Sequence, residues 1–369
     1  MSQSCALREH YLRSLCGLCP GPLRGHHPGQ PDRLQRCSRL LPMVVKTLAL
    51  SVALSVALPV AAQTQDFPAR PIRLIEGFGP GGVVDLVARL LMPKLSAALG
   101  QPIVLENRVG AAGIIASSMV AKAPPDGHTW LITTGSHTSN TAFNAANVPY
   151  DPLKDFTAVT QVARTYGMVH VVHPSIPARN VAEFVALARK YPGKLTYGAA
   201  GVGNIFYIGA EMLKAFSGTD IRYVQYKGGA QATNDLMGGH IDMLFLTTPV
   251  AMPLIKGGKA RPLAITGPVR WKGLPEVPTM REAGFRDFDL IGWFGLWLPV
   301  NTRPEIVARL HAEVDRAVAE PDIRSRFDEL GLLPGGMRTD EFARYVAQDL
   351  AQMRELAARI AKAGGHKPE

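Results

Sequence analysis

Short apolar runs alternate with longer amphipathic runs along most of the chain. The short runs predict strands at residues 72–75, 102–106, 128–133, 168–172, 195–197, 221–225, 241–246, 261–266 and 291–298. The longer runs predict helices at 86–99, 181–190, 305–319 and 339–363, with others ending near residues 122, 216 and 236. Pro304 is well suited to the first position of a helix. This alternation is typical of the α/β class, and we expect a mostly parallel sheet covered by helices.

A glycine-rich turn joins the first predicted strand to the first predicted helix. Its residues are Phe78, Gly79, Pro80, Gly81, Gly82, Val83, Val84 and Asp85. Glycines let a ligand approach the backbone, and the free N–H groups at a helix start favour an anion. We therefore hypothesise an anion site made by the N–H groups of Gly81, Gly82 and Val83. The alternative is a plain strand-to-helix turn without a ligand.

Two better-known glycine loops do not fit this sequence. Gly77 and Gly82 have P-loop spacing, but valines follow where that motif needs Lys and Ser or Thr, which argues against nucleotide hydrolysis. Gly201 and Gly203 begin a possible dinucleotide motif, but its third glycine is absent. Asp220 also precedes the strand at 221–225 instead of ending it. We therefore expect no cofactor.

The sequence has no recognisable catalytic or metal-binding signature. Ser136 and His137 are adjacent, but no third group is evident that would orient them as a nucleophile and base. The histidines His137, His170, His173 and His240 lack ligand spacing. Asp85 is either a general base or a carboxylate that accepts backbone N–H groups and fixes the loop. Arg108 either binds a carboxylate ligand or forms a structural ion pair. We expect a protein that is not an enzyme and holds no metal.

Residues 43–62 have the pattern of a cleaved signal peptide. A basic residue, Lys46, is followed by about a dozen apolar residues and by small residues before Gln63. The run is too short and Ala-rich to be a good membrane span. Because this signal begins at Met43, we interpret residues 1–42 as a non-native upstream extension, the alternative being a genuine long basic leader. The prediction is export to the periplasm.

The expected processing changes the charge and the cysteine content. All four cysteines lie within residues 1–42, so the mature chain would have none, which excludes a lipoprotein. Residues 1–62 carry seven Lys or Arg and two Asp or Glu, which removes five of the ten net positive charges. The remaining Lys and Arg are scattered without a basic stripe, so we expect no nucleic-acid partner. A mild positive field favours small anionic ligands.

An ordered set of short motifs extends from residue 67 to about residue 364. They are residues 71–75, 78–85, 100–108, 125–129, 149–156, 192–197, 225–229, 235–242, 274–279 and 293–296. This set resembles the Bug family, the extracytoplasmic receptors of tripartite tricarboxylate transporters.

The resemblance implies a type II periplasmic-binding-protein fold. It has two α/β lobes, a two-stranded hinge and a ligand in the cleft, here with lobe 1 at 63–165 and 293–369 and lobe 2 at 166–292. Besides residues 78–85, the family's ligand loops correspond to Thr134, Gly135, Ser136, His137, Ala199, Ala200, Gly201, Val202, Gly203, Asn204 and Thr247.

The expected ligand is a small organic acid, captured by a monomer that works with membrane permease subunits. A receptor that serves a two-component sensor kinase is the alternative, and a two-lobed hydrolase or transferase is a third. The chain departs from the family's usual Ser, Thr or Asp at Val84, at residues 199–207 and at Leu246. Fewer polar partners predict a carboxylate with an apolar or aromatic part, in preference to an amino acid or citrate.

Overall fold

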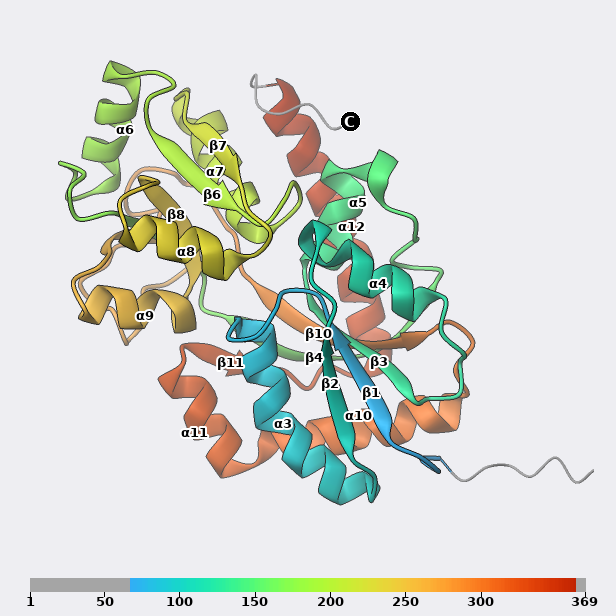
Figure 1. Cartoon of the computed structure of the whole chain (residues 1–369). Coiled ribbons are helices and arrows are strands. Elements are labelled where there is room, and N and C mark those ends of the chain that lie inside the picture. The colour runs from blue at the N-terminus through green and yellow to red at the C-terminus, as the bar shows by residue number, and fades with distance from the viewer. Residues whose placement is uncertain (1–66, 363–369) are drawn as a thin grey trace, which may run out of the picture. The chain divides into compact units, whose positions relative to one another are not determined.

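The structure, a computed structural model, describes residues 67–362 (Figure 1). The predicted signal peptide and upstream extension lie outside these residues. The described strands form two sheets. Sheet A has the order β11-β4-β10-β3-β1-β2 and consists of β1 (Ile72–Glu76), β2 (Ile103–Asn107), β3 (Thr129–Thr134), β4 (Phe156–Thr165), β10 (Trp293–Pro299) and β11 (Leu332–Pro334). Sheet B has the order β7-β6-β8-β5-β9 and consists of β5 (Met168–Val172), β6 (Thr196–Ala199), β7 (Arg222–Gln225), β8 (Met243–Thr247) and β9 (Arg261–Ile265).

Helices surround both sheets, which confirms the predicted α/β class (Figure 1). Those that follow strands of sheet A or pack on it are α3 (Val83–Leu99), α4 (Ile114–Ala121), α5 (Ser136–Phe143), α10 (Pro304–Ala319), α11 (Pro321–Glu329) and α12 (Thr339–Lys362). Those around sheet B are α6 (Val181–Lys190), α7 (Ile205–Ser217), α8 (Gly229–Met237) and α9 (Thr248–Lys256). Short 3-10 turns occupy Ala111–Gly113 and Ala145–Asn147.

The expectation of a mostly parallel sheet is wrong, because both sheets are mixed. Strand β1 is parallel to β2 and β3, and β6 is parallel to β7 and β8. In sheet A, β10 is antiparallel to β3 and β4, and β11 is antiparallel to β4. In sheet B, β5 is antiparallel to β8 and β9. Strands β10 and β5 are the ones that arrive from the other sheet. A strand that arrives directly from the other sheet has no crossover helix to reverse it, so it pairs in the opposite direction.

The two crossings between the sheets lie side by side. The chain leaves sheet A after β4 and returns at β10. Beside these crossings, the N–H of Thr165 donates to the carbonyl of Gly292 at 2.7 Å, and the N–H of Gly292 donates to Thr165 Oγ1 at 3.0 Å. This pairing is the two-stranded hinge that the resemblance implies.

Local signals explain several element boundaries. Helix α10 begins at Pro304 as predicted, because a first-turn residue needs no N–H. Helix α6 begins after Asn180, whose side chain accepts the N–H of Glu183 at 2.8 Å. Helix α12 buries one face through Phe342, Val346 and Leu350, at the spacing of an amphipathic helix.

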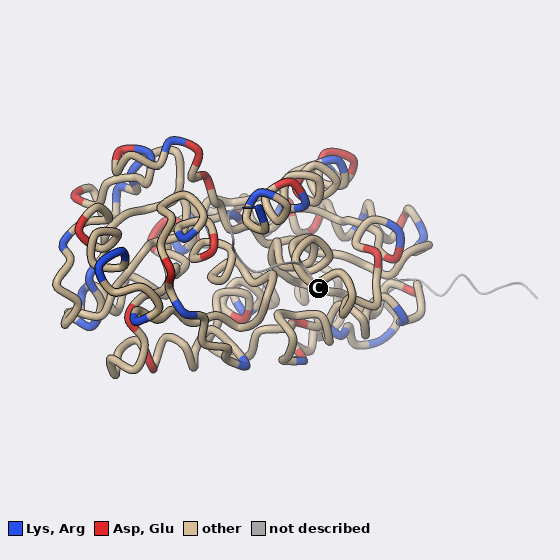
Figure 2. Tube along the Cα trace, turned by 90° about the horizontal axis from the view of Figure 1, so that it is seen from above, with Lys and Arg blue, Asp and Glu red and all other residues tan. Residues whose placement is uncertain are grey.

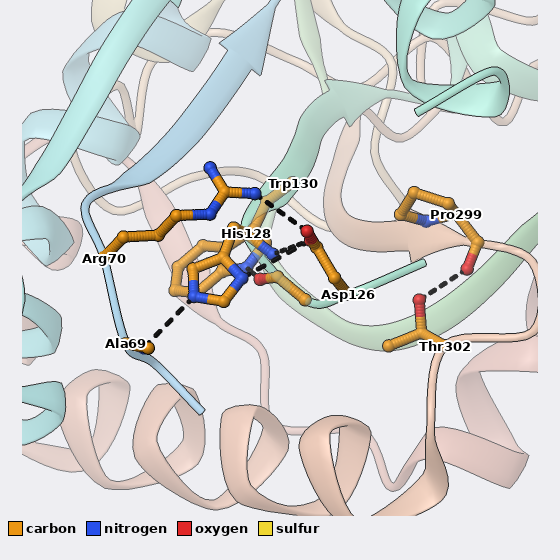
Figure 3. A network of polar contacts seen from close by, with 8 residues as sticks. Ala69, Arg70, Asp126, His128, Trp130, Pro299 and Thr302 are labelled. Carbon is orange, nitrogen blue, oxygen red and sulfur yellow. Dashed lines mark hydrogen bonds and ion pairs between the residues drawn. The ribbon is translucent and has the colours of Figure 1, made fainter. Parts of the chain in front are cut away.

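A polar network fixes the first described residues beneath sheet A (Figure 3). The N–H of Ala69 donates to His128 Nε2 at 3.2 Å, and Arg70 pairs with Asp126 at 2.8 Å. Asp126 also accepts the N–H of His128, at 2.9 Å. These contacts join the start of β1 to the start of β3, at the amino ends of the parallel strands.

The charged residues of the described chain are interspersed. Figure 2 shows Lys and Arg alternating with Asp and Glu along the trace, without a broad stripe of one sign in that view. Many of them form short-range ion pairs such as Arg316 with Glu313 and Arg326 with Glu329.

His170 is buried without a polar partner in the core of sheet B. Its ring stacks on Phe245 at 4.8 Å and meets Phe184 edge-on at 5.1 Å. Neither ring nitrogen has a hydrogen-bond partner among the described residues. Burial lowers the pKa of His170 to about 3, so the ring is neutral in the folded protein.

We expect His170→Leu to reduce the acid sensitivity of the fold. Its folded pKa lies below the unfolded value, so this histidine costs no stability above pH 6.5 and destabilises the fold as pH falls below it. Removing it should shrink the loss of unfolding free energy between pH 7 and pH 5 by about 2 kcal/mol. Denaturant titrations of both proteins at the two pH values measure this difference. An unchanged pH dependence would mean that His170 finds a proton partner.

Candidate functional site

A cavity of about 220 Å³ lies between loops of sheet A and sheet B. Residues from both sheets line it, together with the return crossing at Gly292. The lining residues are Phe78, Gly81, Gly82, Val83, Val84, Thr134, Asn204, Ile205, Phe206, Gly229, Ala230, Thr233, Asn234, Thr247, Val250, Gly292, Trp293 and Phe294. None of them is a Lys, Arg or His.

Four helices begin at this cavity. Helices α3, α7, α8 and α9 each contribute their cap or first-turn residues to its wall. Each helix start carries unpaired N–H groups and the positive end of a macrodipole. The side chain of Thr247, at the cap of α9, forms no capping bond, and Gly82 and Gly228 have no side chain to cap α3 and α8. The cavity therefore has a positive potential made by neutral groups, which suits an anion.

The glycine loop is organised by the buried carboxylate of Glu76. It accepts the N–H of Phe78 at 2.7 Å, the N–H of Gly79 at 2.9 Å and the side-chain amide of Asn107. Burial raises the pKa of Glu76, although these donors oppose the shift. Gly79 and Gly81 adopt positive φ angles of 89° and 78°, which only glycine adopts readily. The loop is therefore fixed in shape before any ligand arrives.

The predicted N–H donors of this loop need a correction. Gly81 donates its N–H to Asp85 Oδ2 at 3.2 Å, and Gly82 donates to the Gly79 carbonyl at 3.3 Å. The N–H groups of Val83 and Val84 have no partner among the described residues, since the first turn of α3 offers no acceptor. The available donors are therefore those of Val83 and Val84.

The structural interpretations of Asp85 and Arg108 are confirmed. Asp85 accepts the Gly81 N–H and pairs with Arg89 at 2.9 Å, so it shapes the loop instead of facing the cavity. The guanidinium of Arg108 pairs with Glu106 at 2.6 Å. Neither residue lines the cavity.

The predicted site residues separate into two groups. Those that line the cavity are Phe78, Gly81, Gly82, Val83, Val84, Thr134, Asn204 and Thr247. Those that do not line it are Gly79, Pro80, Asp85, Gly135, Ser136, His137, Ala199, Ala200, Gly201, Val202 and Gly203. The second group is close in sequence to the lining residues: in the glycine loop, around the start of α5, and from the end of β6 to the start of α7.

Ser136 and His137, which were expected in a ligand loop, lie in the first turn of helix α5. His137 in this helix stacks on Tyr150 at 5.2 Å, and burial lowers its pKa to about 3. Ser139 donates its hydroxyl to the carbonyl of Gly203 at 2.5 Å, which joins α5 to the loop after β6. Polar side chains that bond to backbone groups hide the apolar period by which a helix is recognised.

Several lining residues were not predicted. They are Gly229, Ala230, Thr233, Asn234, Val250, Gly292, Trp293 and Phe294. Gly228 and Gly229 follow β7 and precede the main part of α8. They repeat the order of strand, glycines and helix seen at residues 72–86, so this part of the lining could have been predicted from the sequence. Trp293 lies at the cavity because β10 pairs with strands that are distant in the sequence. No local pattern in the sequence predicts that pairing.

The cavity combines apolar walls with few side-chain polar groups. Phe78, Phe206 and Trp293 supply aromatic surface. Asn204 is occupied in capping α7, since its side chain accepts the Phe206 N–H at 3.0 Å. The hydroxyl of Thr247 is buried and has no partner among the described residues, so it is available to a ligand.

Three residues at the positions where the chain departs from the family's usual pattern do not face this cavity. Ala199, Ala200 and Leu246 are buried and absent from the lining. Leu246 belongs to the apolar core of the second sheet, because it alternates with Thr247 along β8 and points to the other face. At the other such positions, Val84, Ile205 and Phe206 do line the cavity and add to its apolar surface.

Comparison with known proteins identifies the fold and the family. Residues 87–362 match the model of the tripartite tricarboxylate transporter family receptor. The chain belongs to this receptor family. It is 30% identical to the protein BugT of Bordetella pertussis over 307 residues, which cover 82% of this chain and 93% of BugT. The Bug resemblance read from the motifs is thereby confirmed.

Solved structures of this receptor family match the whole fold. A structure from R. palustris with adipate is 35% identical, covers 80% of this chain and 99% of its own, and has a TM-score of 0.77. MatC from Rhodopseudomonas palustris, with bound malate, is 31% identical, covers 79% and 99%, and has a TM-score of 0.75. The chain is a solute-binding receptor of this family, whose members are periplasmic binding proteins and not enzymes, as predicted.

We expect Thr247→Val to weaken carboxylate binding without unfolding the receptor. Valine has nearly the same shape but lacks the hydroxyl, so one hydrogen bond to a charged group is lost. The dissociation constant should rise about 10-fold or more. Calorimetric titration with adipate measures it.

The matched control is Thr157→Val on β4, which removes a hydroxyl away from the cavity. Equal losses of affinity in the two variants would remove Thr247 from the ligand site. A thermal melt of each variant checks that the fold is retained.

Proposed function

We propose that this receptor captures a linear organic acid with an extended apolar part, of which a dicarboxylate such as adipate is the type. The observation that carries the proposal is the convergence of four helix starts on a cavity with aromatic and aliphatic walls. The adipate in a relative of 35% identity supports this ligand class. Malate in MatC supports a dicarboxylate and represents a shorter, more polar alternative.

The proposed contacts to the first carboxylate are backbone N–H groups and one hydroxyl. We infer that Val83 and Val84 donate from α3, and that the starts of α7 and α8 add further amides. Thr247 donates its otherwise unpaired hydroxyl. Hydrogen bonds to a charged group are worth about 1.5–3 kcal/mol each, which offsets desolvation of the carboxylate.

The proposed selectivity against amino acids follows from the lining. An ammonium group needs acceptors, and the lining contains no Asp or Glu. Burying an ammonium without partners costs several kcal/mol, whereas each Å² of hydrocarbon buried against Phe78, Ile205 or Phe206 contributes about 25 cal/mol. Citrate would bring a third carboxylate, for which the lining offers no Lys, Arg or His.

We propose further that the receptor is an exported monomer that delivers its ligand to membrane permease subunits. The family description supports a transporter partner. Within residues 67–362, no helix is long and apolar enough to cross a membrane. The alternative is delivery of the ligand to a sensor kinase. Measuring uptake of labelled adipate by cells with and without the receptor distinguishes a permease partner from a sensor partner.

The processing of the chain is open to a direct test. We expect the secreted protein to begin at Gln63 or within one or two residues of it, because Val60 and Ala62 occupy the −3 and −1 positions of the predicted cleavage site. Mass spectrometry of the N-terminal peptide from a periplasmic extract measures this. A periplasmic form that contains Cys16 or Cys37 would contradict both the cleavage and the upstream extension.

The ligand class is tested by calorimetric titration with a panel of acids. We expect adipate or a benzoate-type acid to bind more tightly than malate, and malate more tightly than aspartate, glutamate or citrate. Ligand that co-purifies can be identified by mass spectrometry after denaturation. Tightest binding of citrate or an amino acid would show that the apolar lining does not set the specificity.

A further inference from the structure

The wall of the cavity formed by Trp293 is supported from behind by a carboxylate. The indole Nε1 of Trp293 donates to Asp349 Oδ1 on α12 at 3.1 Å. The rest of the ring is confined, since Phe342 and Tyr345 meet it edge-on at 5.8 Å and 5.5 Å. A Cβ at Gly135 would lie 2.8 Å from Nε1, so only glycine fits there. Asp349 is therefore the polar group that fixes the indole.

The surroundings of Asp349 suit a carboxyl group that exchanges a proton. Its second oxygen contacts Thr138 Oγ1, which also lies 2.8 Å from the Gly135 carbonyl. The hydroxyl has one hydrogen and two competing acceptors. When Asp349 carries a proton, it donates to Thr138, and Thr138 donates to Gly135, so all three groups are satisfied.

No cation neutralises Asp349 within the described residues. No Lys or Arg is among the groups that shift its pKa, and desolvation by burial raises that pKa to about 6. The charged and titratable groups around it are Tyr345, Glu355 and Arg359 on α12, Asp287 and Asp289 across a second cavity, and Arg164 near Tyr345. This second cavity, of about 400 Å³, is lined by Asp349 and gives it access to water.

We propose that Asp349 is a positioning residue that holds the Trp293 wall and couples capture of an anion to uptake of one proton. This inference rests on the proposed function. An anion on one side of the indole and a carboxylate behind it repel each other, so the bound ligand favours protonated Asp349. By linkage, protonation strengthens anion binding equally. Affinity therefore rises as pH falls from 8 toward 6.

The test compares wild type with Asp349→Asn, which keeps an acceptor for the indole but does not titrate. Adipate is titrated calorimetrically at pH 6 and pH 8, each in two buffers of different ionisation enthalpy. Wild type should bind about 5-fold or more tightly at pH 6, with net proton uptake, whereas the variant should show neither. Because both proteins see the same ligand at each pH, titration of adipate itself cancels. Matching pH profiles would overturn the proposal.

A ligand-free readout separates this inference from the proposed function. The Trp293 emission, taken as the difference between wild type and Trp293→Phe, should titrate with a midpoint near pH 6 that Asp349→Asn abolishes. Thr138→Val, which removes a donor to the carboxylate, should move the midpoint upward, and it replaces Asp349→Asn if that variant does not fold. No titration in wild type would overturn the role of Asp349. Absence of carboxylate binding at every pH would overturn the proposed function and the coupling, and would leave the emission titration to decide the positioning role alone.

Discussion

The direction of the parallel strands is the constraint on which the site depends. A helix that follows a parallel strand begins at the carboxyl end of that strand, with unpaired N–H groups. This occurs from β1 to α3 in one sheet, and from β6 to α7, β7 to α8 and β8 to α9 in the other. Because one cavity borders both sets of helix starts, four positive helix ends meet there. The unpaired N–H groups at these helix starts need hydrogen-bond acceptors, which water or an anion can supply.

The carboxylates around the site determine which amides stay available. Glu76 and Asp85 accept the N–H groups of Phe78, Gly79 and Gly81, so these amides serve the shape of the loop. Asn107 joins the two carboxylates, and Arg89 pairs with Asp85. The amides of Val83 and Val84 remain, one helical position further in. A rigid loop loses little entropy when a ligand binds, which favours affinity without extra contacts.

Sequence patterns predicted what is local and missed what depends on distant pairing. The strand and helix periods, the glycine turn and Pro304 are local, and they led to the fold class and to the first wall of the cavity. Helix α5 was missed because its residues are polar. The sequence interpretation placed both Leu246 and its neighbour Thr247 at the ligand. Adjacent residues of a strand face opposite sides of the sheet, so the two side chains cannot share one site. Trp293 reaches the cavity only through the antiparallel pairing of β10 with β3 and β4, which no window of sequence encodes.

Neutral dipoles give this site a different character from an ion-paired one. An Arg or Lys in the cavity would place a full charge at one point, and a buried anion would then be held by a strong local pair. Here the positive charge is divided among four helix starts and belongs to the backbone, so its strength depends on the fold more than on any single side chain. The side chains are left to set size and polarity. The indole of Trp293 lines the cavity with apolar surface, while its N–H donates to Asp349 on α12 and is not available to a ligand. Helix α12 thus holds one wall of the cavity in place without lining it.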